Sequence, residues 1–492
     1  MNCFNLASLI QSKRNLRVIA FADTVEHIGL KYKENELECL ERLYDNLASV
    51  RDLSNFYFGY IIPQIGKEFD LLRFSIEDII NIELKSESSS EEIKEQLRKN
   101  RYYLKALDKK IYTYSYILSE DILYCLDDDE EEMRKVEFEE LVDLLEAQEI
   151  IEKINLDELF LPKNYLVSPF NSTKKFMEKN YFLTDHQLAI KKSILSDFSN
   201  SSYCFSGITG EPGTGKTLLT YDIVKELRNT KKVAIIHCAK LNRGQEILKN
   251  EYGWKIYSVA SIDELFHDNE YEVVVVDEAQ RIYTAQLDQL HEYVTNNNIK
   301  CLFSYDAKQC FSDFEFNRAN PKKIEVEFKA KKYKLTKTIR SNIEIGTFVN
   351  NLFNPRQSRL GGEYNSVKVE FFSDSNSVLR YVNELKNRGW RGINYTSSKY
   401  NQVTYDSYQT SNNPNAHEVI GQEYDKVVAV IDRNFYYDSQ NYLASQRVKG
   451  APGYDLDKML YQIVTRAKSE LLILILNNHD VLKRCLNIFN SK

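Results

Sequence analysis

The sequence predicts an α/β protein in which two lobes built on parallel sheets follow a smaller domain of mixed α/β structure. From about residue 175 onward, short apolar strands alternate with turns and helical stretches, which is the pattern of parallel sheets joined by crossover helices. Residues before about 160 instead mix helical periodicity with strand-like runs. A chain of 492 residues is also too long for one hydrophobic core of usual size, so we expect two to four compact units.

The expected elements follow one another in a clear order. In the first domain the helical run NELECLERLYDNL precedes the strand-like runs FYFGYII, EFDLLRF, IINIELK and IYTYSYIL. The later strands are YCFSGI, VAIIHC, EVVVVD and CLFSYD, and then VKVEFF, RGINYT, KVVAVI and LLILIL. We place the first domain at residues 1–160, a linker at 161–178, the first lobe at 179–330 and the second lobe at 331–492. Two of the eight prolines and a polar cluster interrupt the periodicity in the linker.

The composition is typical of folded globular domains, with 43% hydrophobic and 28% charged residues. The formal net charge of -7 gives no support to nucleic-acid binding through bulk charge, so any basic groove must be local. The eight cysteines are scattered without zinc spacing or a dense disulfide framework, which favours a reducing cytoplasm. The longest apolar runs are too short to cross a bilayer, and the start lacks a signal-peptide core. We therefore expect a cytoplasmic protein without a membrane partner.

The first domain contains the residue types that metal-dependent phosphodiester cleavage needs, namely clustered carboxylates and a lysine. Asp70 lies in the strand-like run EFDLLRF. About a dozen residues later, strand alternation places Glu83 and Lys85 on one face, with Ile82 and Leu84 on the other. A Glu-x-Lys pattern in a half-exposed strand is common, so the alternative interpretation is an ordinary surface strand.

This arrangement resembles the PD-(D/E)xK nuclease superfamily, whose fold is restriction-endonuclease-like. The preceding helix with Glu36 resembles the NERD branch of that superfamily, whose members often carry helicase domains. The resemblance implies that Asp70 and Glu83 bind Mg²⁺, that Lys85 acts near the attacking water, and that Glu36 completes the acidic ring.

Three details of this resemblance stay open. Glu34 and Glu38 are alternatives to Glu36, since one sequence does not fix the rotation of the helix. Phe69 stands where the family has a proline before the aspartate. Gln96 and Tyr102, on the following helix, have a spacing similar to that of the family's accessory pair.

The segment GEPGTGKT at residues 210–217 follows a predicted strand and precedes a helical stretch, which is the context of a phosphate-binding loop. Glycines such as Gly213 and Gly215 let the backbone aim its N–H groups at phosphate oxygens, and the helix N-terminus adds a favourable dipole. Lys216 is expected to neutralise the β and γ phosphates of ATP, and the Thr217 hydroxyl to bind Mg²⁺.

Two acidic residues end the strand EVVVVD at the edge of the sheet where the phosphate loop is also expected. Asp277 is predicted to hold Mg²⁺, and Glu278 to polarise the attacking water. A strand-terminal acidic turn is the alternative interpretation. It is less favoured because the pair follows the phosphate loop by about sixty residues.

At this point the chain resembles superfamily 1 helicases over roughly residues 175 to 490, which implies two recA-like lobes. LTDHQ looks like the adenine-reading segment with Gln187 as the base contact, and YDAKQ looks like the coupling motif with Gln309 as γ-phosphate sensor. LTKTIR and YQIVTRA resemble the two second-lobe segments that supply arginines, here Arg340 and Arg466. GQEYD resembles the late motif that contacts the ribose, with Glu423 as our choice.

Two features distinguish this chain within the resemblance. Tyr305 stands where family members usually have glycine, which is expected to affect packing more than chemistry. Only about 280 residues separate Gln187 from Arg466, which leaves little room for large inserted subdomains. The size is similar to that of the compact helicase-like domain of Schlafen-type proteins.

Together these patterns predict an ATP-dependent nuclease and helicase that acts on DNA rather than RNA, with ATP and Mg²⁺ as cofactors. ATP hydrolysis would drive movement or a conformational change that licenses cleavage. Antiphage defence is the role suggested by analogy with the domain pairing. A DNA repair helicase with a processing nuclease is one alternative. Another is an ATPase switch whose first domain is a non-catalytic DNA-binding or partner-docking module. A homo-oligomer or a partner protein stays open.

Overall fold

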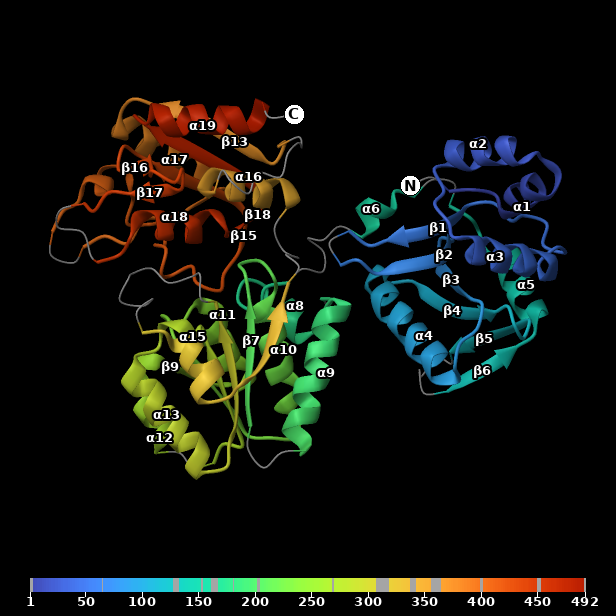
Figure 1. Cartoon of the computed structure of the whole chain (residues 1–492), viewed down its shortest axis with the longest axis horizontal. Coiled ribbons are helices and arrows are strands. Elements are labelled where there is room, and N and C mark those ends of the chain that lie inside the picture. Colours follow the sequence, from blue (N-terminus) through green and yellow to red (C-terminus); the bar gives the residue numbers. More distant parts are fainter. Residues whose placement is uncertain are drawn as a thin grey trace. The chain divides into compact units, whose positions relative to one another are not determined.

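The computed structural model describes residues 3–490, except 64, 127–131, 152–153, 161–166, 180, 201–203, 268–269, 307–317, 337–341, 355–363, 399–400 and 449–452. The chain divides into two compact units. Unit 1 comprises Met1–Tyr165 and Asn180–Asp185, and unit 2 comprises Leu166–Lys179 and His186–Lys492. Both units are α/β structures (Figure 1), so the predicted fold class is confirmed.

Unit 1 is built on one mixed six-stranded sheet with the order β1-β2-β3-β4-β5-β6. Its strands are β1 (Phe56–Ile61), β2 (Glu68–Phe74), β3 (Asp78–Lys85), β4 (Lys110–Ile117), β5 (Ile122–Leu126) and β6 (Met133–Val136). The pair β3 and β4 is parallel, and the other neighbouring pairs are antiparallel. Its helices include α1 (Leu6–Asn15), α2 (Val18–Ile28), α3 (Glu34–Asn46), α4 (Ser90–Leu104), α5 (Phe138–Ala147) and α6 (Leu156–Leu159).

The two faces of this sheet carry different layers. Ile82 and Leu84 join one hydrophobic cluster with residues of α1, α2, α3 and α5. Glu83 alternates with them and meets the side chain of Asn100, on α4, on the opposite face. Helix α4 begins with a capping box, in which the Ser89 hydroxyl accepts from the Glu92 N–H and the Glu92 carboxylate accepts from the Ser89 N–H. The expected alternation of β3 therefore leaves Glu83 facing α4.

The first lobe of unit 2 contains a six-stranded sheet with the order β12-β7-β11-β10-β8-β9, and its paired strands are parallel. The strands are β7 (Cys204–Gly210), β8 (Val233–His237), β9 (Lys255–Ser258), β10 (Val273–Asp277), β11 (Lys300–Tyr305) and β12 (Lys331–Leu335). The main helices are α9 (Asp185–Asn200), α10 (Lys216–Leu227), α11 (Arg243–Tyr252), α12 (Ile262–Phe266) and α13 (Thr284–Asn296). Residues of α12 and α13 pack with β8, β10 and β11 in one hydrophobic cluster.

The second lobe has a parallel sheet with the order β13-β18-β15-β14. Its strands are β13 (Val367–Phe372), β14 (Arg391–Gly392), β15 (Tyr424–Ile431) and β18 (Ala467–Leu476), beside the hairpin β16 (Phe435–Tyr437) and β17 (Leu443–Ser445). The surrounding helices are α16 (Ile343–Phe353), α17 (Ser375–Asn387), α18 (Leu456–Val464) and α19 (His479–Asn490). The central strand β18 is the run LLILIL, and its apolar side chains are buried on both faces, as a parallel sheet requires.

The boundaries between these parts differ from the predicted ones. Strand β12 pairs with β7, so the first lobe continues beyond the expected limit at residue 330. Much of the predicted linker, residues 166–179, folds with unit 2 and includes helix α8 (Thr173–Met177). Residues 180–185 fold with unit 1, where the hydroxyl of Tyr103 donates to the carbonyl of Leu183 over 2.8 Å. Proline and polar residues interrupt periodicity, but they do not prevent a segment from packing.

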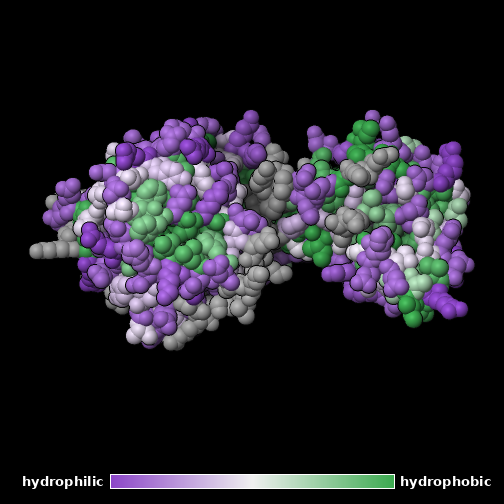
Figure 2. Space-filling view, turned by 90° about the horizontal axis from the view of Figure 1, so that it is seen from above, coloured by the Kyte–Doolittle hydropathy of each residue, from purple (hydrophilic) through white to green (hydrophobic). Residues whose placement is uncertain are grey.

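Within the described part of the chain, every helix is too short or too polar to cross a membrane. On the faces visible in Figure 2, hydrophilic side chains surround smaller hydrophobic areas on each unit. Exposed apolar side chains include those of Val18 and Ile19 at the start of α2.

Candidate functional site

Asp70 and Glu83 lie side by side on neighbouring strands of unit 1. Strands β2 and β3 are antiparallel, and Leu71 pairs with Ile82. That is the last pair of the register, and Asp70 and Glu83 are the next residues along the two strands. The carboxylate of Asp70 accepts a hydrogen bond from the backbone N–H of Leu84, with 2.8 Å between Oδ2 and N. The register therefore brings two of the predicted metal ligands together.

The electrostatics of this pair favour a bound cation. Burial and, next, the charge of Glu83 raise the pKa of Asp70 to about 7. The ammonium groups of Lys85 and Lys67 act in the opposite direction on the pKa of Asp70, so all four charged groups lie near one another. Because two close carboxylates repel each other and Mg²⁺ prefers oxygen ligands, the residues present fit a divalent cation.

Amide groups from α4 fix the orientation of Glu83. Gln96 donates its Nε2 to Oε2 of Glu83 over 3.0 Å, and Asn100 donates its Nδ2 to Oε1 over 2.6 Å. Asn100 also lies 2.6 Å from Oδ1 of Asn81, whose own amide donates to the carbonyl of Leu71. These buried bonds leave little freedom for the carboxylate. Sequence reasoning noted Gln96 but missed Asn100 and Asn81, because ordinary amides carry no signal until helix and strand are packed.

Glu36 and Tyr102 have hydrogen-bond partners other than Asp70 and Glu83. Glu36 occupies the first turn of α3, where its carboxylate accepts from the backbone N–H of Lys33 at 3.0 Å and pairs with the Lys33 ammonium at 2.7 Å. Tyr102 donates its hydroxyl to the carbonyl of Tyr181 rather than to Glu83 or Asp70. Among the described residues, no three Asp, Glu, His or Cys side chains gather as metal ligands. The structure thus places Asp70, Glu83 and Lys85 near one another, while Glu36 is paired with Lys33.

The predicted phosphate loop joins β7 to α10 in unit 2. Gly213 and Gly215 have φ angles of 74° and 84°, in the left-handed region that suits glycine, and Gly215 is the residue before the first turn of α10. The loop is closed by the hydroxyl of Thr214, which donates to the carbonyl of Glu211 over 2.8 Å. Its backbone therefore turns sharply at the helix N-terminus, the arrangement that binds phosphate.

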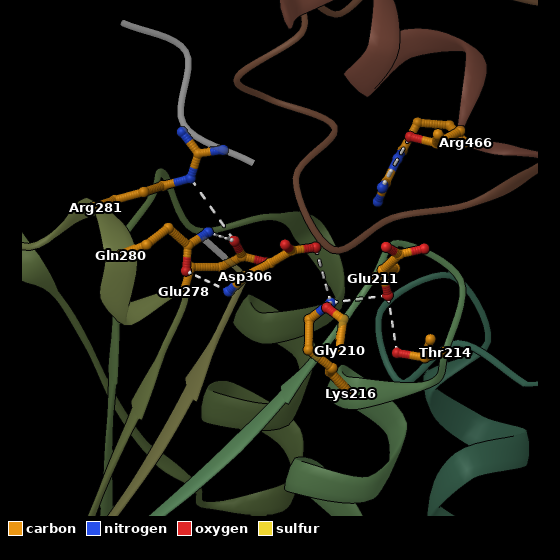
Figure 3. A network of polar contacts seen from close by, with 10 residues as sticks. Gly210, Glu211, Thr214, Lys216, Glu278, Gln280, Arg281, Asp306 and Arg466 are labelled. Atoms are coloured by element: carbon orange, nitrogen blue, oxygen red, sulfur yellow. Dashed lines mark hydrogen bonds and ion pairs between the residues drawn. The ribbon is translucent and has the colours of Figure 1, made fainter. Parts of the chain in front are cut away.

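The ammonium group of Lys216 lies at the mouth of this loop (Figure 3). It donates to the carbonyl oxygens of Gly210 and Glu211 over 2.6 and 3.1 Å. It also pairs with the carboxylate of Asp306, 3.2 Å away at the end of β11. The carboxyl ends of β7 and β11 meet at one edge of the sheet, which brings the two side chains together.

Asp277, at the end of β10, offers an oxygen that suits a metal ion. Its Oδ2 lies 3.1 Å from Nδ1 of His237, the neighbouring residue on β8. Its Oδ1 is buried and has no hydrogen-bond partner among the described residues. Because a buried carboxylate oxygen without a partner is costly, Mg²⁺ bound by Asp277 and Thr217 fits this position. His237 therefore contacts the other oxygen of the carboxylate.

Glu278 follows Asp277 in a left-handed conformation with φ of 59°. Its Oε2 accepts from the side-chain amide of Gln280 over 2.6 Å. The other end of that amide, Oε1 of Gln280, accepts from the backbone N–H of Asp306 over 3.1 Å. A continuous polar network therefore runs from Lys216 through Asp306 and Gln280 to Glu278, as Figure 3 shows.

Arg466 reaches the phosphate loop from the second lobe. It follows α18, and its guanidinium donates to the carbonyls of Gln422 and Gln462, each over 3.2 Å. Its side chain points toward the loop from the opposite side of the crevice (Figure 3). A small polar cavity lies between the lobes. It is lined by Pro212, Gly213, Gly215, Lys216, Thr217, Glu278, Gly421, Glu423 and Arg466.

One match to a known protein family covers most of the first lobe. Residues 183–340 match the AAA domain family. The match starts just before α9 and includes the phosphate loop and the acids of β10. No curated protein matches the chain in sequence.

The structure is also similar to solved structures at low identity. Pif1 helicase from Candida albicans has 15% identity and a TM-score of 0.34, over 63% of this chain and 100% of that one. Pif1 from Bacteroides sp in complex with ADP-AlF4 has 13% identity and a TM-score of 0.32, over 61% of this chain and 94% of that one. AMPPCP-bound DnaA from Aquifex aeolicus has 10% identity and a TM-score of 0.24, over 33% and 50%. Because these TM-scores are low, the proposals below depend on the side chains of this chain.

Four other residues singled out in the sequence lie within residues 183–340. Gln187 is buried in the first turn of α9, where its Nε2 donates to the carbonyl of Thr214 in the phosphate loop over 3.2 Å. Gln309 and Arg340 lie outside the described residues. Tyr305 is buried in the core, and Gly207 on β7 leaves room for its ring, since a Cβ there would lie 3.0 Å from it.

The segment predicted as a linker contributes two residues that the sequence did not point to. Asn171 accepts a hydrogen bond from the backbone N–H of Glu423 over 3.2 Å. The ring of Phe170 packs edge-on to Tyr221, with 4.8 Å between centroids, and a Cβ on Gly421 would lie 2.7 Å from it. Phe170 and Asn171 therefore support the second-lobe wall of the crevice. The only sequence signal was a proline-containing polar stretch, which indicates a loop rather than a site.

Proposed function

We propose that this chain is an ATP-dependent nuclease and helicase that acts on DNA. The observation that carries the proposal is the crevice of unit 2, where the phosphate loop with Lys216 and Thr217 faces Glu423 and Arg466 of the other lobe. Because residues of both lobes contact one nucleotide, the distance between the lobes depends on whether ATP or its products are bound. ATP is the substrate that this arrangement fits.

Each residue of the crevice has a chemical role in ATP hydrolysis. Lys216 neutralises the phosphates, and Arg466 stabilises the negative charge that develops on the transferring phosphoryl group. Thr217 and Asp277 would hold Mg²⁺, which when bound neutralises phosphate charge. Glu278 orients the attacking water, and its bond to Gln280 keeps the carboxylate in place.

Movement follows from the position of Arg466 on the second lobe. Its guanidinium stabilises the reaction only when the crevice is closed, and hydrolysis removes the charge that favours closure. A cycle of closure and opening would then advance the chain along DNA or change its conformation. Binding in a local groove is required, because the net charge of -7 does not favour nucleic acid.

The ATPase proposal is tested by Lys216→Ala and Arg466→Ala in the full chain. Each is expected to lower the rate of ATP hydrolysis by about 100-fold or more, because a charge that stabilises the transition state is lost. The matched controls are Lys232→Ala and Arg433→Ala, which remove exposed cations outside the crevice. Equal loss in the controls would contradict the assigned roles. If neither DNA nor RNA stimulates ATP hydrolysis, the helicase proposal is wrong and the alternative of an ATPase that acts as a conformational switch is favoured.

The nuclease proposal is supported by the group of Asp70, Glu83 and Lys85. Asp70 and Glu83 would hold Mg²⁺, which when bound supplies Lewis-acid activation of the phosphodiester and of water. Lys85 lies at the end of β3 on the same face as Glu83, where its ammonium is placed to steer the attacking water. The orientation of Glu83 by Gln96 and Asn100 keeps one ligand in position before the metal arrives.

Cleavage is tested with single-stranded, duplex and supercoiled DNA in the presence of ATP and Mg²⁺ or Mn²⁺. Glu83→Ala and Lys85→Ala are expected to abolish cleavage and to leave ATP hydrolysis unchanged. Lys135→Ala is a suitable control, because Lys135 is an exposed lysine of the same sheet. Wild-type protein that leaves every DNA form uncut would favour the docking module as the function of unit 1.

The biological role we propose is antiphage defence, and it is supported by the pairing of the two activities alone. Expression of the wild-type chain should lower the plating efficiency of phage, and Lys216→Ala or Glu83→Ala should restore it. Protection against DNA-damaging agents instead, with no effect on phage, would favour a repair helicase.

A further inference from the structure

Lys67 is a buried lysine that the proposed mechanism has not used. It directly precedes β2, where its carbonyl accepts from the backbone N–H of Ile62 and closes a tight turn. Only 5% of its surface is exposed. Lysines are rarely buried to this degree unless their charge is matched by a partner.

Within the described part of unit 1, no carboxylate is in direct contact with the ammonium group of Lys67. It makes no ion pair within 4.0 Å and no side-chain hydrogen bond there, and it lies over the ring of Phe69, 5.1 Å from Nζ to the centroid. Burial lowers the pKa of Lys67, which reflects the cost of holding the charge there. A buried cation that no anion contacts directly is costly, and such groups concentrate at functional sites.

The groups around Lys67 indicate which class of ligand its ammonium can bind. The charges of Glu83 and Asp70 both act on the pKa of Lys67, so its ammonium lies near the two carboxylates. Those carboxylates already accept hydrogen bonds from the amides of α4 and from the Leu84 N–H. A ligand that fits here has an anionic oxygen that the ammonium can bind. It also binds the metal ion held by the two carboxylates, which offsets their repulsion. A phosphodiester has both properties.

We propose that Lys67 binds a non-bridging oxygen of the phosphodiester that unit 1 acts on. This inference rests on the proposed nuclease function and names a further phosphate-binding residue for it. Lys67 is distinct from Lys85, which is partly exposed at the end of β3, whereas Lys67 is enclosed beside Phe69. A fixed cation in an enclosed pocket stabilises the charge that builds on the phosphate oxygens during cleavage without having to reorganise.

The first test compares Lys67→Met, Lys67→Arg and Lys110→Met in the full chain. Met keeps most of the apolar stem of the side chain and removes the charge. Lys110→Met is the matched control, since Lys110 also lies over an aromatic ring, 4.7 Å from Tyr112, but is exposed. Lys67→Met should lower kcat for DNA cleavage by about 100-fold, and Lys67→Arg should restore part of it. Lys110→Met should cleave as wild type does.

Mn²⁺ binding separates a phosphate contact from a structural role. Lys67→Met should bind Mn²⁺ at least as tightly as wild type, because a cation that repels the metal is gone, while Glu83→Ala should bind it weakly. ATP hydrolysis should be unchanged in both. If Lys67→Met loses Mn²⁺ affinity together with cleavage, Lys67 supports the fold of the pocket and the proposal is wrong. Wild-type cleavage by Lys67→Met also overturns it.

A binding measurement keeps the proposal testable even if wild-type protein cuts no DNA. In that case the nuclease function fails on its own, and the probe is a 5′-phosphorylated dinucleotide with Ca²⁺, measured by calorimetry. Wild type and Lys110→Met should bind it with equal affinity, and Lys67→Met at least about tenfold more weakly, as expected for one lost charged hydrogen bond. Equal affinity in wild type and Lys67→Met, or no binding to wild type, would rule out a phosphate contact at Lys67.

Discussion

Asp70 shows how the position of one carboxyl group determines its protonation. The group has an ordinary pKa near 3.8, but burial and the charge of Glu83 raise that pKa to about 7 in the folded chain. Between these two values the folded state keeps a proton that the unfolded state has already lost. The free energy of unfolding of unit 1 therefore decreases as pH rises from about 4 to about 7 in the absence of metal.

The first prediction concerns this pH dependence. In metal-free protein, hydrogen exchange protection of peptides from β2 and β3 should fall between about pH 4 and pH 7, after correction for intrinsic exchange. Asp70→Asn should show little such fall, because its side chain does not ionise. Adding Mg²⁺ at the higher pH should restore protection in wild type and not in Asp70→Asn. Protection that is equally insensitive to pH in both proteins would contradict the raised pKa.

Asp306 leads to a second prediction at the residue scale. Without nucleotide its carboxylate holds the ammonium of Lys216 at 3.2 Å, and an ATP phosphate needs the same ammonium. Asp306→Asn removes the competing anion but keeps the backbone bond to Gln280. We expect nucleotide affinity to increase by roughly 3- to 10-fold, since the weakened pair is worth about 1 kcal/mol. Fluorescent ADP analogues measure this directly, and weaker binding would show that Asp306 belongs to the binding site itself.

At the scale of elements, two glycines in helices differ in the space that a side chain would have. A Cβ on Gly244 in α11 would lie 2.2 Å from the backbone carbonyl oxygen of Phe170, so the segment after residue 166 packs directly on this helix. A Cβ on Gly346 in α16 would meet nothing within 4 Å. The first glycine permits a close approach of two backbones, and the second serves no such purpose.

The third prediction follows from this contrast. Gly244→Ala should lower the free energy of unfolding of unit 2 by at least about 2 kcal/mol, because rigid backbone must move. Gly346→Ala should raise it by about 0.5 to 1 kcal/mol, through the helix propensity of alanine. Urea unfolding followed by tryptophan fluorescence is suitable, since both tryptophans of the chain, Trp254 and Trp390, lie in unit 2. Similar effects of the two substitutions would contradict the packing of the segment on α11.

At the scale of the whole molecule, the chain itself connects the two candidate sites. Residues 180–185 fold with unit 1, where Asp185 accepts from the hydroxyl of Tyr103 and pairs with Lys99, both on the helix that orients Glu83. Two residues further on, Gln187 belongs to unit 2 and contacts the phosphate loop. A short stretch of α9 therefore has one end in each unit.

The fourth prediction is that this stretch transmits the state of the nucleotide. Tyr103→Phe removes the hydrogen bonds to Leu183 and Asp185. It should reduce the effect of ATP on DNA cleavage severalfold, while ATP hydrolysis and cleavage without ATP keep their wild-type rates. Tyr124→Phe is the control, because Tyr124 has an exposed hydroxyl on β5 of the same sheet. An unchanged effect of ATP on cleavage in Tyr103→Phe would exclude this route.

The sequence by itself determined the strands, the phosphate loop and the division into parallel and mixed sheets. These features depend on short stretches of chain, because strand alternation and the glycines of a tight loop act within a few consecutive residues. The same local logic placed Glu83 and Lys85 on one face of β3, and it placed Asp277 and Glu278 at the carboxyl edge of the lobe sheet.

Only the tertiary structure decided which distant residues meet. The pairing of β2 with β3 brought Asp70 near Glu83, the packing of α4 added Asn100, and a hydrogen bond across 252 residues tied Asn171 to Glu423. It also paired Glu36 with Lys33. Register, helix rotation and loop packing depend on contacts between segments far apart in the chain, and local residue patterns do not specify those contacts.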